Sequence, residues 1–337
     1  MNWARIAADY RTMAKPRAVE EVGDIYLIRP LGFLLVQLLR RTPLTPTMVS
    51  VLAVLAGWWS AWLYFASNRE GLVPELAALG GLALLLHSAL DSADGQLARL
   101  KNLQTPLGRI VDGFCDNLSF IAIYVAIVLG HWQRTPDHHL AVALLALAAG
   151  ASHSVQSSLV EYQRTLYLHC VHGRGDIVDA EPERLRRAAA PGPGALFLQA
   201  IHRLYYRQQR FYLASTARLE ERIARWRRDN PGQLPALAER YERSHRPLLP
   251  FWALMASNSH KLGIVVAAFA PIVGTSFWGG LGMGWYFVYV LALNVPLAAL
   301  LQAQRRVDRV LGGELDALDG QEPRGATKNP LARRRKS

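Results

Sequence analysis

Four aspartates in two pairs are the residues of this sequence best suited to chemistry. Asp91 and Asp94 are three residues apart, and Asp112 and Asp116 are four residues apart. On helices, each spacing places both members of a pair on one face, and a short connection would bring the two pairs together. Four clustered carboxylates repel one another unless a cation is bound. Oxygen-only ligands favour Mg²⁺ or Mn²⁺, and Mg²⁺ is commonly held by carboxylates together with substrate phosphates. The spacing therefore predicts a divalent-metal site for a phosphate ester.

Small and basic residues lie beside these acids in the sequence. Gly95 weakens a helix by up to about 1 kcal/mol relative to Ala, so we expect it to serve close approach. Together with Ala98 it would leave a shallow face for a ligand. Arg99 and Arg109 could reach phosphate oxygens. The alternative is that the acids cap helices or pair with these arginines and Lys101, which explains one aspartate more easily than four.

Long apolar helices must position these residues. Hydrophobic residues make up 51% of the 337 residues, and charged residues only 19%, below the roughly 25% of globular proteins. About 20 apolar residues cross a bilayer, and six stretches approach this: 50–68, 72–90, 111–130, 139–158, 251–272 and 280–303. The shorter run from Tyr26 to Leu39, interrupted by Arg29-Pro30, suits an interfacial helix. We expect an all-α polytopic membrane protein with six transmembrane helices and an amphipathic N-terminal interfacial helix.

The distribution of basic residues predicts the orientation. With six spans, both termini and the loops 91–110 and 159–250 share one side, and 35 of the 38 Lys and Arg residues lie there. The positive-inside rule makes that side cytoplasmic, so we expect both termini and the active site on the cytoplasmic side of the cell (inner) membrane. The net charge of +12 then reflects the membrane, and no nucleic acid is expected as a partner. Two cysteines exclude a disulfide framework.

The same pattern divides the chain into five segments. They are a cytoplasmic or interfacial N-terminal segment (1–45), helices one to four with the motif 91–116 (46–158), a cytoplasmic helical insertion (159–250), helices five and six (251–304) and a basic cytoplasmic tail (305–337). Within the insertion, the apolar periodicity of 197–226 predicts an amphipathic helix. Lying on the anionic membrane surface and packing on the protein are the two alternatives. We predict that it lies on the cytoplasmic membrane surface near the mouth of the active site, with lipid contact at Ile201 and Ile223.

The stretch from Asp91 to Asp116 resembles the signature of the CDP-alcohol phosphotransferase (CDP-alcohol phosphatidyltransferase) family. It fills every fixed position of Asp-x2-Asp-Gly-x2-Ala-Arg-x8-Gly-x3-Asp-x3-Asp. The resemblance implies an enzyme in which the first three aspartates hold two divalent ions, Mg²⁺ or Mn²⁺, against the CDP pyrophosphate. The fourth completes the metal site or acts as the base. The resemblance also implies that Gly95, Ala98 and Arg99 line the nucleotide pocket and that Gly108 permits close approach of the helices. Thr47 stands where family members often have Asn, which puts one nucleotide contact in doubt.

The expected reaction transfers a substituted phosphate from a CDP-alcohol to an alcohol hydroxyl and releases CMP, in phospholipid biosynthesis. CDP-diacylglycerol is the preferred donor. A soluble CDP-headgroup of choline, ethanolamine or inositol type, with a lipid or polyol phosphate acceptor, is the alternative. From another class, a membrane transporter or a metal-binding scaffold could also use intramembrane carboxylates.

Polar residues in the last spans are candidates for acceptor binding, because polar groups within a membrane are commonly functional. They are His153, Asn258, His260 and Lys261. Hydrogen bonds between helices are the alternative explanation. Besides the two substrates, the lipid bilayer is the expected partner, and the glycine pattern over 279–284 leaves a homodimer open.

Overall fold

The structure is a computed structural model that describes residues 10, 16–69, 73–103, 106–134, 138–173, 207–273 and 282–321, without the side chains of 106–112, 271, 273 and 319–321. Every regular element within these ranges is helical and no strand occurs among them. The prediction of an all-α polytopic membrane protein is therefore confirmed. The division into five segments stays a prediction.

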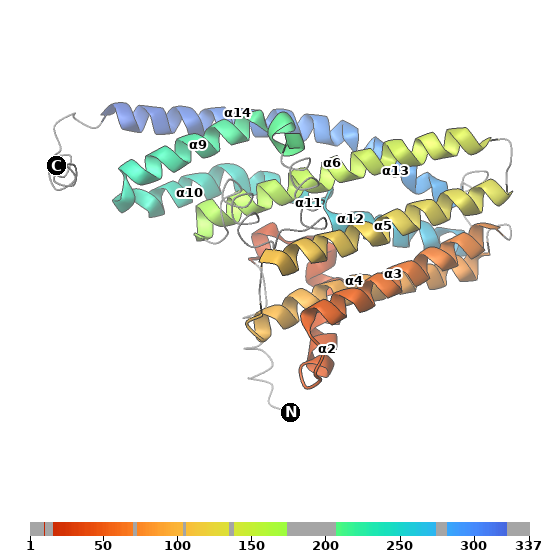
Figure 1. The fold of residues 1–337 in the computed structure, drawn as a ribbon. Coiled ribbons are helices and arrows are strands. Elements are labelled where there is room, and N and C mark those ends of the chain that lie inside the picture. The colour runs from red at the N-terminus through yellow and green to blue at the C-terminus, as the bar shows by residue number, and fades with distance from the viewer. Residues whose placement is uncertain are drawn as a thin grey trace, which may run out of the picture.

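Five helical stretches of the described chain are long and apolar enough to cross a membrane. Four are single helices, and the fifth runs through two helices in succession (Figure 1). Their elements are α3 (Pro46–Arg69), α4 (Pro74–Leu100), α5 (Pro106–Arg134), α6 (His139–His172), α13 (Trp285–Ala292) and α14 (Asn294–Gln321). The break between the last two precedes Pro296, which has no N–H to donate to the carbonyl of Ala292.

The fifth predicted crossing, 251–272, is not one helix. It is divided into α11 (Leu249–Ala253) and α12 (Ser257–Phe269), with extended backbone at Ala256. Lys261 of α12 contacts Asp91 of α4, and Phe269 approaches Gly81 near the other end of α4. The short α12 thus lies along α4, but it lacks the length of a span. The count of six transmembrane helices is not confirmed.

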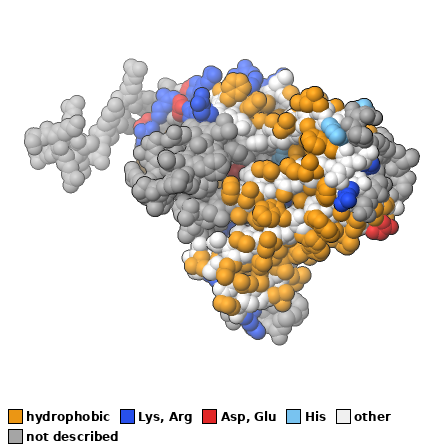
Figure 2. Space-filling model, turned by 45° about the vertical axis from the view of Figure 1, so that its right-hand side comes forward, with side chains coloured by type: hydrophobic (Ala, Val, Ile, Leu, Met, Phe, Trp, Pro, Cys, Tyr) orange, Lys and Arg blue, Asp and Glu red, His pale blue; other side chains and the backbone are white. Residues whose placement is uncertain are grey.

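Helices α3, α4 and α5 pack closely side by side (Figure 1). Small residues permit the approach, since a Cβ atom on Gly80 would lie 2.6 Å from the Tyr64 ring and one on Gly57 would lie 2.6 Å from Ser119 Oγ. Hydrophobic side chains cover most of the face of this bundle in Figure 2, whereas Lys and Arg side chains gather mainly at its margins. The outer surface therefore suits lipid.

The predicted amphipathic N-terminal helix is present as η2 (Asp24–Ile28) followed without a break by α2 (Arg29–Leu39). Phe33 and Val36 face the protein, whereas Leu34 and Leu38 are exposed. Pro30 does not interrupt the helix: it lies in the first turn of α2, directly after the π-helical turn η2, whose last hydrogen bond runs from the Arg29 N–H to the Asp24 carbonyl.

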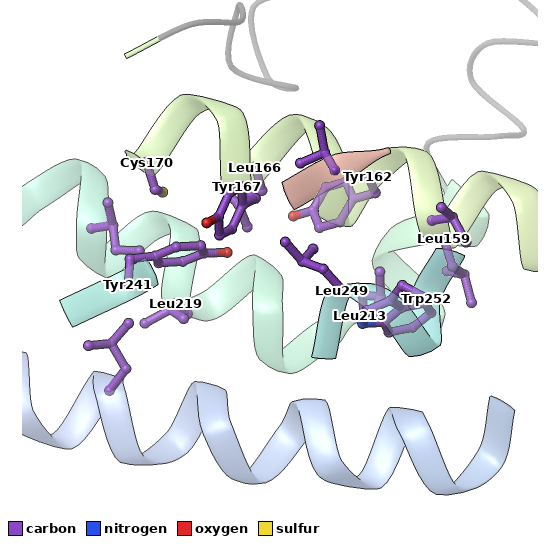
Figure 3. Close-up of a cluster of buried hydrophobic side chains, with 14 of the residues drawn as sticks. Leu159, Tyr162, Leu166, Tyr167, Cys170, Leu213, Leu219, Tyr241, Leu249 and Trp252 are labelled. Atoms are coloured by element: carbon purple, nitrogen blue, oxygen red, sulfur yellow. The ribbon is translucent and has the colours of Figure 1, made fainter. Parts of the chain in front are cut away.

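Beyond the apolar crossings, the C-terminal parts of α6 and α14 pack with α9 (Ala214–Asp229) and α10 (Leu234–His245), and we call these four the end bundle (Figure 1). Its core contains aromatic and aliphatic side chains from all four helices (Figure 3). The remaining short elements are η1 (Arg17–Val19), η5 (Pro231–Gln233), η6 (Arg246–Leu248), η7 (Ala270–Val273) and η9 (Gly282–Gly284).

The end bundle shows whether the predicted amphipathic helix over 197–226 lies on the membrane surface or packs on the protein, for the described residues 207–226. Leu219, Ile223 and Trp226 of α9 are buried in its core, so α9 packs on the protein. The expected lipid contact at Ile223 is wrong, because α6, α10 and α14 cover the apolar stripe that the sequence left without a partner. Ile201 lies outside the described residues.

A buried carboxylate connects three helices of the end bundle. Asp308 Oδ2 of α14 accepts hydrogen bonds from the Ser215 and Thr216 hydroxyls of α9, at 2.8 and 2.7 Å. Its Oδ1 atom accepts one from Gln304 Nε2 at 2.8 Å and lies 3.2 Å from His245 Nε2 of α10. The stability of the end bundle therefore depends on this one acidic side chain.

We predict that Asp308→Ala destabilises the end bundle. Several buried groups lose their acceptor at once, and each buried unsatisfied group costs about 1–3 kcal/mol. Thermal melting of the full chain in detergent and the rate of proteolysis within 207–246 report the change. Asp316→Ala is the control, because its exposed ion pair with Arg222 contributes at most about 1 kcal/mol. Equal melting of the two variants would contradict the prediction.

Candidate active site

Two of the four predicted aspartates meet at one lysine. Lys261 Nζ of α12 lies 3.1 Å from Asp91 Oδ2 of α4 and 2.6 Å from Asp116 Oδ1 of α5. The Lys261 side chain is 3% exposed, while about a fifth of each carboxylate side chain remains accessible. Carboxylates from two helices are thus arranged around a single positive charge.

Asp94 lies one turn further along α4 and faces α3. Its Oδ2 accepts a hydrogen bond of 2.6 Å from the Ser50 hydroxyl, and both residues are buried. Thr47, the residue predicted to contact the nucleotide, is exposed at the start of α3, one turn before Ser50.

Asp116 has contacts on both carboxylate oxygens. Its Oδ2 accepts a hydrogen bond of 2.7 Å from the Ser257 hydroxyl, at the first residue of α12. Its Oδ1, which also faces Lys261, lies 3.3 Å from His87 Nε2 of α4. Three side chains from α4 and α12 therefore orient this carboxylate.

The rest of the signature is described in part. Gly95, Ala98 and Arg99 follow Asp94 on α4, and among the described side chains a Cβ atom on Gly95 would meet only the Arg99 guanidinium, at 3.6 Å. The glycine therefore leaves open space beside a basic group, not a tight helix contact. Gly108 and Asp112 belong to α5, but the side chain of Asp112 and the surroundings of Gly108 lie outside the description.

The four acceptor candidates occupy different surroundings. Lys261 belongs to the acidic cluster. His153 and His260 are buried with ring centroids 4.0 Å apart, and His153 Nδ1 lies 3.3 Å from the Tyr124 hydroxyl. Asn258 donates a hydrogen bond of 2.8 Å to Asp24. Acceptor binding by these residues stays a prediction.

The N-terminal segment docks beside the cluster through acidic groups. Glu21 accepts hydrogen bonds from Arg164 of α6 at 3.1 Å and from Ser259 of α12 at 2.9 Å. Burial raises the pKa of Glu21, and the Arg164 guanidinium opposes this rise. Glu21 and Asp24 thus place negative charge at the N-terminus of α12, the positive end of that helix dipole.

A small cavity with room for about one water molecule lies between this segment, α4 and α12. Polar groups and aliphatic side chains both line it. The polar residues are Glu21, Ser88, Asn258, Ser259 and Lys261, and the aliphatic ones are Leu27, Ile28, Leu85, Leu262 and Val265. The cavity therefore brings polar and aliphatic groups together next to Lys261.

The oxygen atoms of the described aspartates are the kind of ligand that a hard divalent cation prefers. Asp91 and Asp116 offer carboxylate oxygens that already converge on a cation, the ammonium of Lys261, and oxygen donors are those that Mg²⁺ and Mn²⁺ prefer. Among the described side chains, no group of three or more His, Cys, Asp or Glu residues comes together closely enough to hold a metal. Metal binding by the four aspartates stays a prediction.

Ser50 and His87 were not predicted to belong to the site, and Ser257 was considered only as part of the polar run at the start of the fifth span, not as a contact of Asp116. His87 precedes Asp91 by four residues, so both lie on one face of α4. Ser257 opens the polar run Ser-Asn-Ser-His-Lys. These signals were present in the sequence, whereas nothing there distinguished Ser50 from the other small residues of α3.

These features describe a polytopic helical membrane protein with an acidic site where α4, α5 and α12 meet. Residues 43–169 match the family model described as CDP-alcohol phosphatidyltransferase. The chain therefore contains a domain of this family, as its signature predicted.

Two curated relatives match parts of the chain. An uncharacterized CDP-alcohol phosphatidyltransferase class-I family protein 3 of Dictyostelium discoideum is 23% identical over 135 residues, 34% of each chain. A bifunctional IPC transferase and DIPP synthase of Rubrobacter xylanophilus is 31% identical over 123 residues, 36% of this chain and 24% of the relative. The chain thus aligns with about a third and a quarter of their lengths.

Proposed function

We propose that the protein transfers a substituted phosphate from a CDP-alcohol to an alcohol hydroxyl and releases CMP. The observation that carries the proposal is the meeting of Asp91 and Asp116 at Lys261, within a domain of this family. Asp91, Asp94, Asp112 and Asp116 would hold Mg²⁺ or Mn²⁺, as two divalent ions by the resemblance. The metal would neutralise pyrophosphate charge and make CMP a better leaving group.

The residues of the chain have separate tasks in this reaction. The acceptor oxygen forms a bond to the far phosphorus of the donor, and the bond from that phosphorus to the oxygen of CMP breaks. The hydroxyl proton passes to Asp116 or to water, and CMP leaves with the electron pair of the broken bond. Arg99 would bind phosphate oxygens, while Gly95 and Ala98 would admit the nucleotide.

We propose CDP-diacylglycerol as the donor and phospholipid biosynthesis as the use. The apolar outer surface of the bundle that carries the acidic site supports a lipid substrate (Figure 2), and polar and aliphatic residues both lie next to Lys261. In the alternative, the donor is a soluble CDP-headgroup and the lipid is the acceptor, so the lipid would bind at the same site as acceptor and not as donor. Acceptor contacts would come from His153, Asn258, His260 or Lys261.

The test is release of CMP by the purified full chain in micelles with Mg²⁺, measured by chromatography. CDP-diacylglycerol with a polar alcohol and CDP-choline with diacylglycerol are the two arms, and mass spectrometry identifies the lipid product. CMP in either arm supports phosphate transfer and assigns the donor. No CMP from either donor would contradict the proposal and favour a transporter or a metal-binding scaffold.

We predict that Asp116→Asn lowers the turnover rate by about 10²–10⁴-fold, the usual contribution of a positioned acid or base, while Mn²⁺ affinity changes little. Three other aspartates remain to hold the metal, so the loss would concern the proton. Turnover measured against Mn²⁺ concentration separates the two roles. Full recovery at saturating Mn²⁺ would assign Asp116 to metal binding alone and remove the base.

A further inference from the structure

We propose that His87 is a positioning residue that fixes the Asp116 carboxylate for phosphate transfer. The proposal rests on the proposed function, because it gives a task to a residue in contact with Asp116. His87 belongs to α4, whereas Asp116 belongs to α5, so the contact connects the two helices that carry the aspartates.

The two ring nitrogens of His87 face different helices. Nδ1 lies 2.8 Å from the carbonyl oxygen of Ala53 on α3. The Ala53 carbonyl and the Asp116 carboxylate both only accept hydrogen bonds, so each ring nitrogen makes its contact as a donor. Nε2 lies 3.3 Å from Asp116 Oδ1. Since the first contact fixes the plane of the ring, Nε2 can meet the carboxylate in only one orientation.

The packing around the imidazole is close. The His87 side chain is 1% exposed, and a Cβ atom on Gly57 of α3 would lie 3.3 Å from its Nδ1 atom. Gly57 thus leaves the room in which α3 and the ring come together. A side chain locked on both sides transmits its position to its hydrogen-bond partner.

The other contacts of Asp116 leave an orienting task for His87. Lys261 and Ser257 both belong to α12, which is joined to α11 through extended backbone at Ala256. His87 is the contact that comes from α4, a helix packed along its length against α3. His87 therefore holds the Asp116 carboxylate at a fixed position relative to α4, the helix that carries Asp91 and Asp94.

Two substitutions separate this role from a merely structural one. His87→Gln places an amide N–H near the position of Nε2, so it keeps a donor for Asp116 and loses the contact with Ala53. His87→Asn places its amide near the position of Nδ1, so it keeps the contact with Ala53 and loses Asp116. His172→Asn is the matched control, because His172 lies exposed at the end of α6.

The full chain in micelles is assayed for CMP release, for Mn²⁺ affinity by electron paramagnetic resonance and for thermal melting. We expect H87N to melt near the wild type but to lose about 10–100-fold in kcat, the usual cost of removing a group that orients a metal ligand. We expect H87Q to keep most of kcat and to melt at a lower temperature. In an Asp116→Asn background, H87N should then cause no further loss, because coupled residues are not additive.

Other results would overturn the inference. If H87N keeps wild-type kcat, or if both variants lose kcat in proportion to melting temperature, His87 only joins α3 to α4. If the wild type releases no CMP, the proposed function fails. The positioning role of His87 is then tested by the Mn²⁺ affinity of the two variants. Weaker binding in H87N than in H87Q would support the positioning role, and equal affinity or no binding would refute it.

Discussion

Asp91→Asn and Asp94→Asn should each lower CMP release by about a thousandfold or more while the protein stays folded. A carboxylate that contributes roughly 4 kcal/mol to the transition state accounts for three powers of ten in rate. In Asp91→Asn the buried Lys261 keeps Asp116 as its counter-ion, and the repulsion between carboxylates falls, so the protein should stay folded. Asp112→Asn should behave in the same way if its side chain joins the others.

The measurement is CMP release at limiting and at saturating Mg²⁺, with melting temperature as the test of folding. Asp229→Asn is the control, because it removes an equal charge from the exposed end of α9. Near-wild-type turnover of either variant at limiting Mg²⁺ would refute the assignment of these aspartates to the metal.

Lys261→Met should destabilise the protein when no divalent cation is present. Lys261 is buried between Asp91 and Asp116, and removing one partner of a buried ion pair costs about 3–5 kcal/mol, since the remaining charges lose their compensation. Added Mg²⁺ should restore more stability to the variant than to the wild type, because a second cation can then neutralise the two acids.

Thermal melting with and without Mg²⁺ tests this expectation. Lys101→Met is the matched control, because within the described part of the chain Lys101 Nζ contacts the backbone carbonyls of Thr42 and Leu44. A Lys261→Met protein that melts like the wild type without metal would show that the two carboxylates need no cation. If Mg²⁺ raises the melting temperature of both lysine variants by the same amount, the metal does not replace the charge of Lys261.

Much of the architecture could be predicted from the sequence because apolar length and residue spacing are local properties. Four of the six predicted crossings coincide with single helices, and the last runs through α13 and α14. The spacing of Asp91 and Asp116 anticipated their approach. Where the chain breaks could not be predicted as well, because the apolar composition of 251–272 continues across the extended residue Ala256.

The contacts between helices were harder to predict. Ser50 and Thr47 lie one turn apart on α3. Which of them lies beside Asp94 depends on how far α3 is shifted along its axis relative to α4, and composition does not determine that shift. His87 and Lys261 were also ambiguous, since an intramembrane histidine or lysine suits a ligand and a helix contact equally well. The partners of both residues lie on other helices, which only the assembled fold brings near. His87 contacts Ala53 and Asp116, and Lys261 contacts Asp91 and Asp116.

The short length of α12 has a consequence for how the protein enters the membrane during synthesis. A helix of 13 residues covers about 20 Å at 1.5 Å per residue, less than the roughly 30 Å of the hydrocarbon core. It also carries His260 and Lys261, and a lysine at the centre of a helix costs about 2.5–3.5 kcal/mol on insertion. Segment α12 is therefore a weak insertion signal by itself. Its entry into the bilayer must be coupled to the earlier placement of α4, whose Asp91 supplies the compensating charge.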